Sequence, residues 1–177
     1  MNSLLLDSTT LGRTVARMAH EIAERNQNGA DVVVIGIQSG GVFLARRLAA
    51  QLQGIYGQPV PAGIVDVSLH RDDLDQRSAP MLRPTELPFD LNGRTVVLVD
   101  DVLYSGRTAR AALDALHDFG RPSRVQLAVL VDRGHRELPI RADFVGKNVP
   151  TSRTQRVEVS LAEDGGNNTV TLQESKA

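Results

Sequence analysis

The chain contains no cysteine and no tryptophan, and only 3% of its 177 residues are aromatic. Without cysteine, a disulfide framework and a thiolate metal site are both excluded. The low aromatic content disfavours an extended platform for stacking nucleic-acid bases. Basic and acidic side chains are nearly balanced, 20 against 21. A uniformly basic coat for nucleic acid is therefore excluded, although a local basic patch is not.

Long apolar runs are also missing. A membrane-spanning helix needs about 20 consecutive apolar residues, whereas the apolar run over 125–131 is short and contains a glutamine. The first residues carry no basic group ahead of an apolar run, unlike a secretory signal peptide. We therefore expect a cytoplasmic protein, and the length suits a single domain over residues 1–177.

Three apolar, β-branched runs are present, at 31–37, 95–99 and 125–131. Nearly continuous runs of this kind are typical of parallel strands covered on both faces. Stripes of apolar residues at helical spacing alternate with them, and the glycines expected to end these helices are Gly29, Gly54 and Gly120. This alternation predicts an α/β domain with a mainly parallel central sheet flanked by helices.

Two regions depart from that alternation. Residues 63–69 look like a strand, but the chain then becomes polar and irregular, which predicts a mobile active-site loop at about 70–82. Near the C-terminus, apolar and polar residues alternate on both sides of the turn sequence Gly165–Asn168. This pattern predicts an antiparallel β-hairpin over about 156–173.

Residues 95–108 carry the strongest chemical signal. An apolar strand runs into Asp100 and Asp101, and a short turn with Ser105 and Thr108 then opens a helix. Ligands of open α/β sheets bind beyond the carboxyl ends of the strands. The free N–H groups and hydroxyls of such a turn suit a phosphate, while paired carboxylates suit sugar hydroxyls with Mg²⁺ close by. The segment therefore predicts a site for a phosphorylated ribose.

Other interpretations of this segment stay open at this point. The two acids are also typical of helix capping, and Gly106 of ordinary turn chemistry. The phosphate-binding pattern G-x-x-x-x-G-K-[ST] and the dinucleotide pattern G-x-G-x-x-G are both absent. The combination of strand, acid pair and Ser-Gly-x-Thr turn favours the ligand site over capping alone.

A family resemblance narrows these alternatives. Residues 97–108, Val-Leu-Val-Asp-Asp-Val-Leu-Tyr-Ser-Gly-Arg-Thr, resemble the PRPP motif of type I phosphoribosyltransferases. Residues 132–152, which begin Asp-Arg-Gly-His-Arg-Glu-Leu-Pro, look like the PyrR family of bifunctional pyrimidine operon regulators and uracil phosphoribosyltransferases. The likeness extends from about residue 4 to the C-terminal hairpin. It implies the type I phosphoribosyltransferase fold with a small hood, in a homodimer or an assembly of dimers.

The resemblance implies the reaction of uracil with PRPP to give UMP and pyrophosphate, with Mg²⁺ bound through PRPP and no metal held directly by the protein. It makes Asp100, Asp101 and Arg71 catalytic, the two acids holding the ribose hydroxyls and the arginine reaching pyrophosphate. It assigns the remaining PRPP contacts, including those to the 5′-phosphate, to Val102, Leu103, Tyr104, Ser105, Gly106, Arg107 and Thr108.

Four further positions follow from the same resemblance. Ser39 and Gly40 match the pyrophosphate loop, where many relatives have Thr-Arg-Gly in place of Ser39-Gly40-Gly41, so a charged contact to pyrophosphate is lost here. Arg133 matches a substrate contact, and Val157 matches a hood residue beside the base.

A second function is implied on another face. Positions that lie on a basic dimer surface in RNA-binding members match five residues here, namely His20, Arg25, Arg136, Arg141 and Lys147. The implied partners are PRPP, uracil, UMP or UTP, and an mRNA leader whose binding UMP favours. The alternative is a nucleotide-sensing RNA regulator with weak or no catalytic activity, and a purine phosphoribosyltransferase is more distant.

Overall fold

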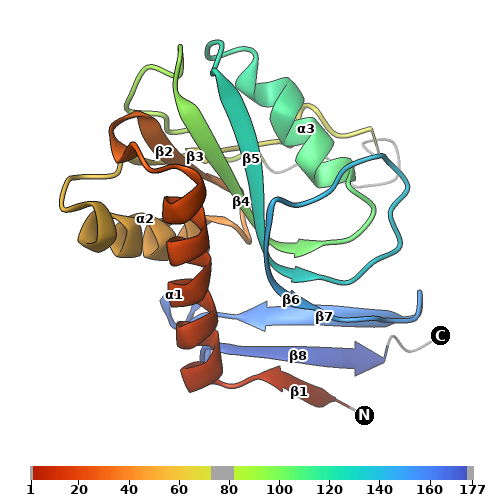
Figure 1. The fold of residues 1–177 in the computed structure, drawn as a ribbon. Helices are drawn as coiled ribbons and strands as arrows, with labels where there is room; N and C mark the ends of the chain where they lie inside the picture. Colours follow the sequence, from red (N-terminus) through yellow and green to blue (C-terminus); the bar gives the residue numbers. More distant parts are fainter. Residues whose placement is uncertain (1, 73–81, 175–177) are drawn as a thin grey trace.

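Five parallel strands form the centre of the computed structural model, which describes residues 2–72 and 82–174 (Figure 1). The strands are β2 (Val32–Ile37), β3 (Ala62–Val65), β4 (Thr95–Leu103), β5 (Arg124–Asp132) and β6 (Phe144–Asn148). Their spatial order is β3-β2-β4-β5-β6, and every neighbouring pair is parallel. The predicted α/β class with a parallel central sheet is confirmed.

Helices cover both faces of this sheet. Helices α1 (Ser8–Arg25) and α2 (Val42–Tyr56) pack on one face and α3 (Arg107–Leu116) on the other (Figure 1). Successive strand residues point to opposite faces, so Val32 and Val34 join the core under α1 and α2, whereas Val33 and Ile35 join the core under α3. Both sets of side chains are buried, which explains why the strand sequences are apolar without alternation.

A second, antiparallel sheet lies below the first (Figure 1). Its strands are β1 (Ser3–Leu6), β7 (Gln155–Ser160) and β8 (Thr169–Glu174), in the order β1-β8-β7. The predicted C-terminal hairpin is confirmed, and the N-terminal strand joins it by pairing with β8. Val157 and Val170 lie in the same apolar core as α1 and α2, so the small sheet and the large one share a core.

The described residues also form short 3-10 turns, η1 (Gly29–Asp31) before β2 and η3 (Ala162–Asp164) after β7. Arg47 of α2 anchors η3, because its Nε and Nη2 donate to Glu163 at 2.8 and 2.5 Å and Nη2 also donates to Asn168 at 2.6 Å. The small sheet is thereby fixed to the helix that follows β2.

Several predicted boundaries differ from the structure. Helix α2 continues through Gly54 to Tyr56 and ends at Gly57, whose φ of 67° is the left-handed conformation that glycine tolerates best. Helix α3 ends at Leu116, before the predicted stop at Gly120. Strand β3 covers 62–65, so the predicted strand over 63–69 is too long. Within residues 2–72 and 82–174, no helix combines the length and apolarity needed to span a bilayer.

Candidate active site

The paired acids lie inside strand β4, not beyond its end as the sequence suggested. β4 pairs with β2 only as far as Val99, but it continues beside β5, where Asp100 is opposite Val129. After β2 the chain crosses through α2 to β3 on one side, while β4 and β5 extend the sheet on the other side. The acids therefore stand at the point where the strand order reverses, which is where open α/β sheets bind ligands.

Asp100 and Asp101 differ in their surroundings. Asp100 is 9% exposed and accepts a hydrogen bond from the Asp101 N–H at 2.9 Å, whereas Asp101 is only partly buried and accepts from the Val102 N–H at 2.7 Å. Burial raises the pKa of Asp100 well above its usual range, the neighbouring Asp101 charge raises it further, and Arg71 counteracts the rise. This carboxyl pair is stabilised by hydroxyl donors or a cation.

A metal fits this site only when a ligand supplies oxygens. Among the described residues there is no group of three or more potential metal-binding side chains. Mg²⁺ prefers six oxygen ligands and keeps several from water or substrate phosphates. Two adjacent carboxylates agree with a cation that is held jointly with a bound phosphate ester.

The turn between β4 and α3 forms a candidate phosphate loop, residues 104–108. Gly106 has a φ of 92° and supplies no side-chain cap to α3, whereas the N–H of Arg107, the first residue of the helix, donates to the Ser105 hydroxyl at 3.4 Å. The segment after β5 supports the loop from outside, since the Glu137 and Leu138 N–H groups donate to the Ser105 carbonyl at 2.9 and 3.2 Å. The helix start thus presents backbone donors and the Ser105 and Thr108 hydroxyls toward one place.

Arg71 and Asp72 lie against this phosphate loop. Nη1 of Arg71 donates to the Thr108 hydroxyl at 3.1 Å, and Asp72 forms an ion pair with Arg107. Nε of Arg107 donates to Glu137 at 2.8 Å, so this guanidinium joins two carboxylates. The structure thereby brings predicted residue 71 next to the loop, whereas residues 73–81 of the predicted mobile loop lie outside the described residues.

The predicted pyrophosphate loop, residues 38–41, connects β2 to α2 beside the acids. Its Gln38–Ser39 peptide bond is cis. Two glycines pack closely on β4, Gly41 against the Val99 carbonyl and Gly40 against the Asp101 carboxylate. Ser39 is exposed and Gly40 half-buried. The loop, the acid pair and the phosphate loop therefore surround one region at the end of the parallel sheet.

Arg133 lies behind the phosphate loop with its side chain fully engaged. It is 7% exposed, its Nε donates to the Thr151 hydroxyl at 3.2 Å, and its Nη2 donates to the Ser152 carbonyl at 3.0 Å. The guanidinium also stacks over the Tyr104 ring, 4.1 Å from the centroid. Val157, the other predicted substrate residue, is buried in β7, the strand of the small sheet that contacts β4.

Comparisons with known proteins agree with this geometry. Residues 2–164 match the model of the phosphoribosyl transferase domain. A bifunctional protein PyrR from Roseiflexus sp. is 62% identical over 164 residues, covering 92% of this chain and 90% of that protein. Another bifunctional protein PyrR, from Halalkalibacterium halodurans, is 50% identical and covers 98% of both chains. The chain belongs to the PyrR family of phosphoribosyltransferase-domain proteins.

Solved structures show the same fold in more distant proteins. The crystal structure of the hypoxanthine phosphoribosyltransferase of Trypanosoma cruzi has a TM-score of 0.74 at 19% identity and covers 98% of this PyrR-family chain and 97% of that one. A hypoxanthine-guanine phosphoribosyltransferase from Bacillus anthracis gives a TM-score of 0.65 at 23% identity, with 84% of each chain covered. The type I phosphoribosyltransferase fold expected for a PyrR protein is confirmed.

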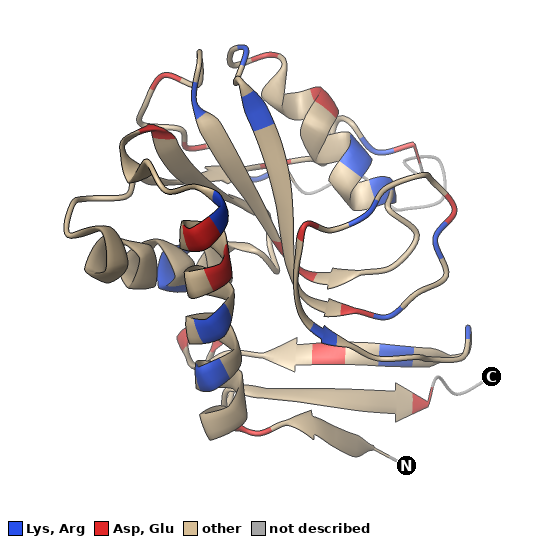
Figure 2. Cartoon of the chain, in the orientation of Figure 1, with Lys and Arg blue, Asp and Glu red and all other residues tan. Residues whose placement is uncertain are grey.

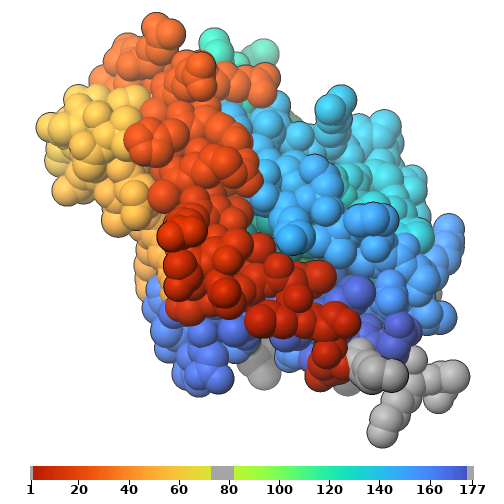
Figure 3. Space-filling model, turned by 60° about the horizontal axis from the view of Figure 1, so that its bottom comes forward, coloured from red at the N-terminus to blue at the C-terminus, as the bar shows by residue number. Residues whose placement is uncertain are grey.

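Three of the five residues predicted for an RNA surface lie on or beside α1 in this PyrR-family chain. His20 and Arg25 are exposed on α1, which packs beside β6 and its exposed Lys147 (Figure 3). Arg25 forms an ion pair with Asp143 at 3.1 Å. Basic and acidic side chains both occur along α1, so the charge on this face is mixed (Figure 2).

The other two predicted RNA residues have different surroundings. Arg136 is directed toward the phosphate loop, where its Nη1 donates to the Tyr104 carbonyl at 2.8 Å. Arg141 is exposed and lines a cavity of about 210 Å³ together with α3 residues such as Leu113. Arg136 therefore lies beside the phosphate loop, whereas Arg141 lines a cavity with both α3 and Asp143, the ion-pair partner of Arg25 on α1.

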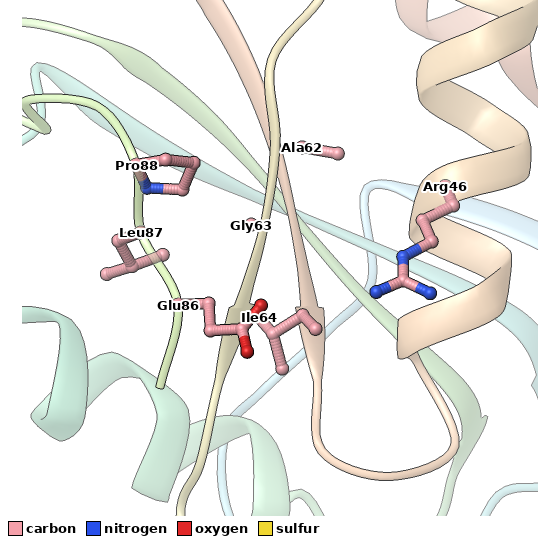
Figure 4. Close-up of a pocket in the computed structure, with 7 residues that line it drawn as sticks. All are labelled: Arg46, Ala62, Gly63, Ile64, Glu86, Leu87 and Pro88. Carbon is pink, nitrogen blue, oxygen red and sulfur yellow. The ribbon is translucent and has the colours of Figure 1, made fainter. Parts of the chain in front are cut away.

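Sequence reasoning missed the side chains that support the site from behind. Asp72, Glu137 and Thr151 each contact a predicted arginine, but no local pattern marks them, because their partners lie 18 to 35 residues away. The larger cavity of about 390 Å³ lies elsewhere, at the edge strand β3 (Figure 4). It is lined by Arg46, Ala62, Gly63, Ile64, Glu86, Leu87 and Pro88, none of them a predicted site residue.

Proposed function

We propose that this chain transfers a phosphoribosyl group from PRPP to uracil, forming UMP and pyrophosphate, and that the same site senses uridine nucleotides for binding to a pyrimidine mRNA leader. One observation carries the enzymatic half: an acid pair on β4, with Asp100 buried and Asp101 partly buried, stands between a phosphate loop and the β2–α2 loop at the switch point of the sheet. Two apolar cores lie on the two faces of this same sheet, which supports a single functional domain over the chain.

In the proposed reaction, N1 of uracil forms a bond to the ribose C1 while the bond from C1 to the pyrophosphate oxygen breaks. Pyrophosphate leaves with the bonding electrons, and N1 loses its proton. The ribose passes through an oxocarbenium-like state, so the main catalytic contributions are orientation and stabilisation of the leaving group. No side-chain nucleophile is required.

Each part of the site then has a role. Asp100 and Asp101 accept hydrogen bonds from the ribose hydroxyls, and the phosphate loop with Ser105 and Thr108 binds the 5′-phosphate. The loop at Ser39 and Arg71 binds the pyrophosphate, where positive charge stabilises the negative charge that develops on departure. Mg²⁺ bound together with PRPP would neutralise further charge on the pyrophosphate, and Asp100 and Asp101 are the protein carboxylates that would help to hold it.

The enzymatic proposal is tested by measuring UMP formation from uracil and PRPP in the presence of Mg²⁺. We expect turnover in the wild type and its loss in the double variant Asp100→Asn/Asp101→Asn. Asp31→Asn, an exposed acid at the opposite end of the sheet, is the matched control and is expected to keep full activity. A wild type that binds UMP but produces none would support the nucleotide-sensing regulator instead.

The regulatory half of the proposal rests on the basic residues beside α1. His20, Arg25 and Lys147 share the face formed by α1 and β6, and a second copy of the chain would extend it in the proposed dimer. Phosphate contacts of this kind weaken binding as salt rises. Filter binding of a pyrimidine-operon leader RNA should strengthen with UMP and weaken in Arg25→Ala, and an unchanged affinity in both comparisons would reject the RNA function.

A further inference from the structure

Asp66 is the first residue after β3, and its carboxylate accepts hydrogen bonds from two segments that are distant in sequence. Oδ1 accepts from the Ser68 N–H at 3.2 Å and from the Ser68 hydroxyl at 2.7 Å, whereas Oδ2 accepts from the Arg83 N–H at 3.1 Å. The Asp66 N–H in turn donates to the Thr85 hydroxyl at 2.9 Å. The main chain and side chain of this one residue therefore hold residues 66–68 against residues 83–85.

The pKa of Asp66 agrees with a carboxylate that serves as an acceptor. Partial burial raises this pKa, but the hydrogen bonds from Ser68 and from the Arg83 N–H outweigh the effect of burial, and the net shift is downward. An ionised carboxylate can accept on both oxygens at once, whereas a protonated one must turn one of them into a donor. The charged form of Asp66 is thus the form that the two segments stabilise.

The segment that contains Arg83 is fixed to the sheet by bonds that do not involve Asp66. The N–H groups of Ile64 in β3 and of Glu86 each donate to the carbonyl of the other residue at 2.8 Å, which forms an antiparallel bridge at the edge of the sheet. Arg83 precedes this bridge by three residues. The Asp66 carboxylate therefore joins the residues that follow it to a part of the chain that the sheet already holds.

The residues that follow Asp66 carry two side chains that contact the phosphate loop. Arg71 donates to the Thr108 hydroxyl at 3.1 Å, and Asp72 forms an ion pair with Arg107. Between Asp66 and Asp72 the chain forms no helix or strand. The position of these two side chains consequently depends on how the beginning of the segment is held.

We infer that Asp66 is a positioning residue for Arg71: its carboxylate fastens residues 67–72 to the segment at 83–85 and thereby sets where the Arg71 guanidinium meets the phosphate loop. The functional consequence rests on the proposed PRPP site, in which Arg71 binds pyrophosphate. Asp66 itself touches neither the acid pair nor the phosphate loop in any hydrogen bond described for it, so it acts through the chain that it holds.

Amide hydrogen exchange, resolved by residue, tests whether Asp66 joins the two segments. In Asp66→Ala the Ser68 and Arg83 N–H groups should both exchange roughly 10-fold faster than in the wild type, because each loses a hydrogen bond to a charged group. Ser68→Ala removes a donor on one side only and should leave the Arg83 exchange rate unchanged. The matched control is Asp90→Ala, because the exposed Asp90 carboxylate also accepts from an N–H two residues later but joins no second segment. It should leave both rates unchanged.

A double-mutant cycle between positions 66 and 71 tests the functional consequence. We expect Asp66→Ala to lower kcat/KM for PRPP roughly 10–100-fold, because misplacement of a positioned group costs this much. In the Arg71→Ala background the same change should have less than about a twofold effect. The affinity for UMP, which lacks pyrophosphate, should stay within about twofold of the wild type. If Asp66→Ala does not fold, Asp66→Asn replaces it in both experiments, since an amide keeps one acceptor oxygen and loses the other.

Three results would overturn the inference. They are unchanged exchange of the Arg83 N–H in the Asp66 variant, an equal loss of kcat/KM in both Arg71 backgrounds, and an affinity for UMP that falls as far as that for PRPP, which would indicate general damage to the fold. Failure of the proposed function is a separate outcome. If the wild type binds PRPP but forms no UMP, the same cycle in calorimetric PRPP affinity decides the inference. If the wild type does not bind PRPP, the proposed function fails, and hydrogen exchange still decides whether Asp66 joins the two segments.

Discussion

Substitution of Arg136 tests whether this side chain holds the phosphate loop or binds RNA. The resemblance implied an RNA contact, whereas in the structure its guanidinium contacts other parts of the protein. Its Nε donates to the Ile140 carbonyl at 2.9 Å, its Nη1 to the Tyr104 carbonyl at 2.8 Å, and its Nη2 to Asp132 at 2.5 Å. The guanidinium thus ties the phosphate loop to the segment that follows β5. We predict that Arg136→Ala destabilises the protein and weakens PRPP binding even without RNA.

The magnitude follows from these three bonds. A hydrogen bond to a charged group contributes about 1.5–3 kcal/mol when it is buried. The Arg136 side chain is 24% exposed and that of Asp132 is 14% exposed, so water replaces part of what is lost. We expect a total loss of about 2–4 kcal/mol in the free energy of unfolding. For a chain of this size, that loss lowers the melting temperature by about 4–16 °C.

The assay compares Arg136→Ala with Arg141→Ala in calorimetric unfolding, PRPP binding and RNA binding. Arg141 is exposed and makes no hydrogen bond or ion pair with the residues that the structure describes, so it is the matched arginine control. Arg141→Ala should leave the melting temperature and the PRPP affinity unchanged. A stable Arg136→Ala variant with wild-type PRPP affinity and no RNA binding would refute the structural role assigned to this side chain.

Three further predictions concern charged groups near the site and the small sheet. Burial raises the pKa of Asp100, so the charged form of this carboxyl destabilises the folded protein at pH values above the ordinary pKa of an aspartate. Asp100→Asn should abolish UMP formation and should stabilise the protein at pH 7 by about 0.5–2 kcal/mol. Calorimetry should show this gain in stability fading as the pH falls and the wild-type acid becomes protonated. Arg47 lowers the pKa of Glu163, so their contact stabilises the fold at pH values above the ordinary pKa of 4.5 and is lost as the pH falls through the lowered pKa. Glu163→Gln should lower the free energy of unfolding by about 0.5 kcal/mol at pH 7, a small amount because the pair is partly exposed to solvent. At acidic pH the same substitution should have no effect on stability. Asp72→Asn removes one of the two carboxylates that pair with Arg107. It should change the free energy of unfolding by less than about 1 kcal/mol but lower kcat/KM for PRPP. Equal kcat/KM values in the variant and the wild type would contradict a role for this contact in the site.

The central sheet was predictable from the sequence because its strands are buried on both faces. Residues 32–37 and 127–131 are apolar without interruption and rich in valine and isoleucine, which is typical of strands covered on both faces. Strand β6 was not predicted from local pattern, since Phe144–Asn148 is an edge strand with a glycine and two polar residues. An edge strand that is half exposed to solvent contains fewer apolar residues, so the hydrophobic pattern that predicts a strand is weak there.

Long-range pairing was beyond local reasoning. The hairpin of β7 and β8 was predictable because apolar and polar residues alternate on both sides of a turn. The pairing of β1 with β8 was not, because it joins residues 3–6 to 170–172 and a strand of four residues does not specify its partner. The helix end at Gly57 was misjudged for a related reason. Gly54 and Gly57 look alike in the sequence, yet only Gly57 takes a left-handed φ, because tertiary packing sets where the chain leaves α2.

The paired acids and the Ser-Gly-x-Thr turn stand out in the sequence as a candidate phosphate-ester site, because the chemistry of those residues is local. The way in which the site is held together was not predictable. Strand β4 continues through Asp100 to Leu103, so the acids belong to a rigid strand and not to a loop. Sequence patterns do not show where the pairing between two strands ends. The pairing of β4 with β2 ends at Val99, before the acids, so one side of Asp101 faces the β2–α2 loop.

The arginines around the phosphate loop have a consequence for how a phosphate is bound there. Arg107 is paired with Asp72 and Glu137, Arg136 with Asp132, and Arg133 with backbone and hydroxyl acceptors. The charges of Arg107 and Arg136 are therefore largely neutralised within the protein, and in the proposed site the 5′-phosphate is left to the backbone N–H groups at the start of α3 and to two hydroxyls. Directional donors of this kind recognise the shape of a phosphate monoester more than its net charge. Affinity for the ribose phosphate should consequently vary less with salt than RNA binding to the exposed basic residues of α1 and β6, and the two activities can be separated by ionic strength.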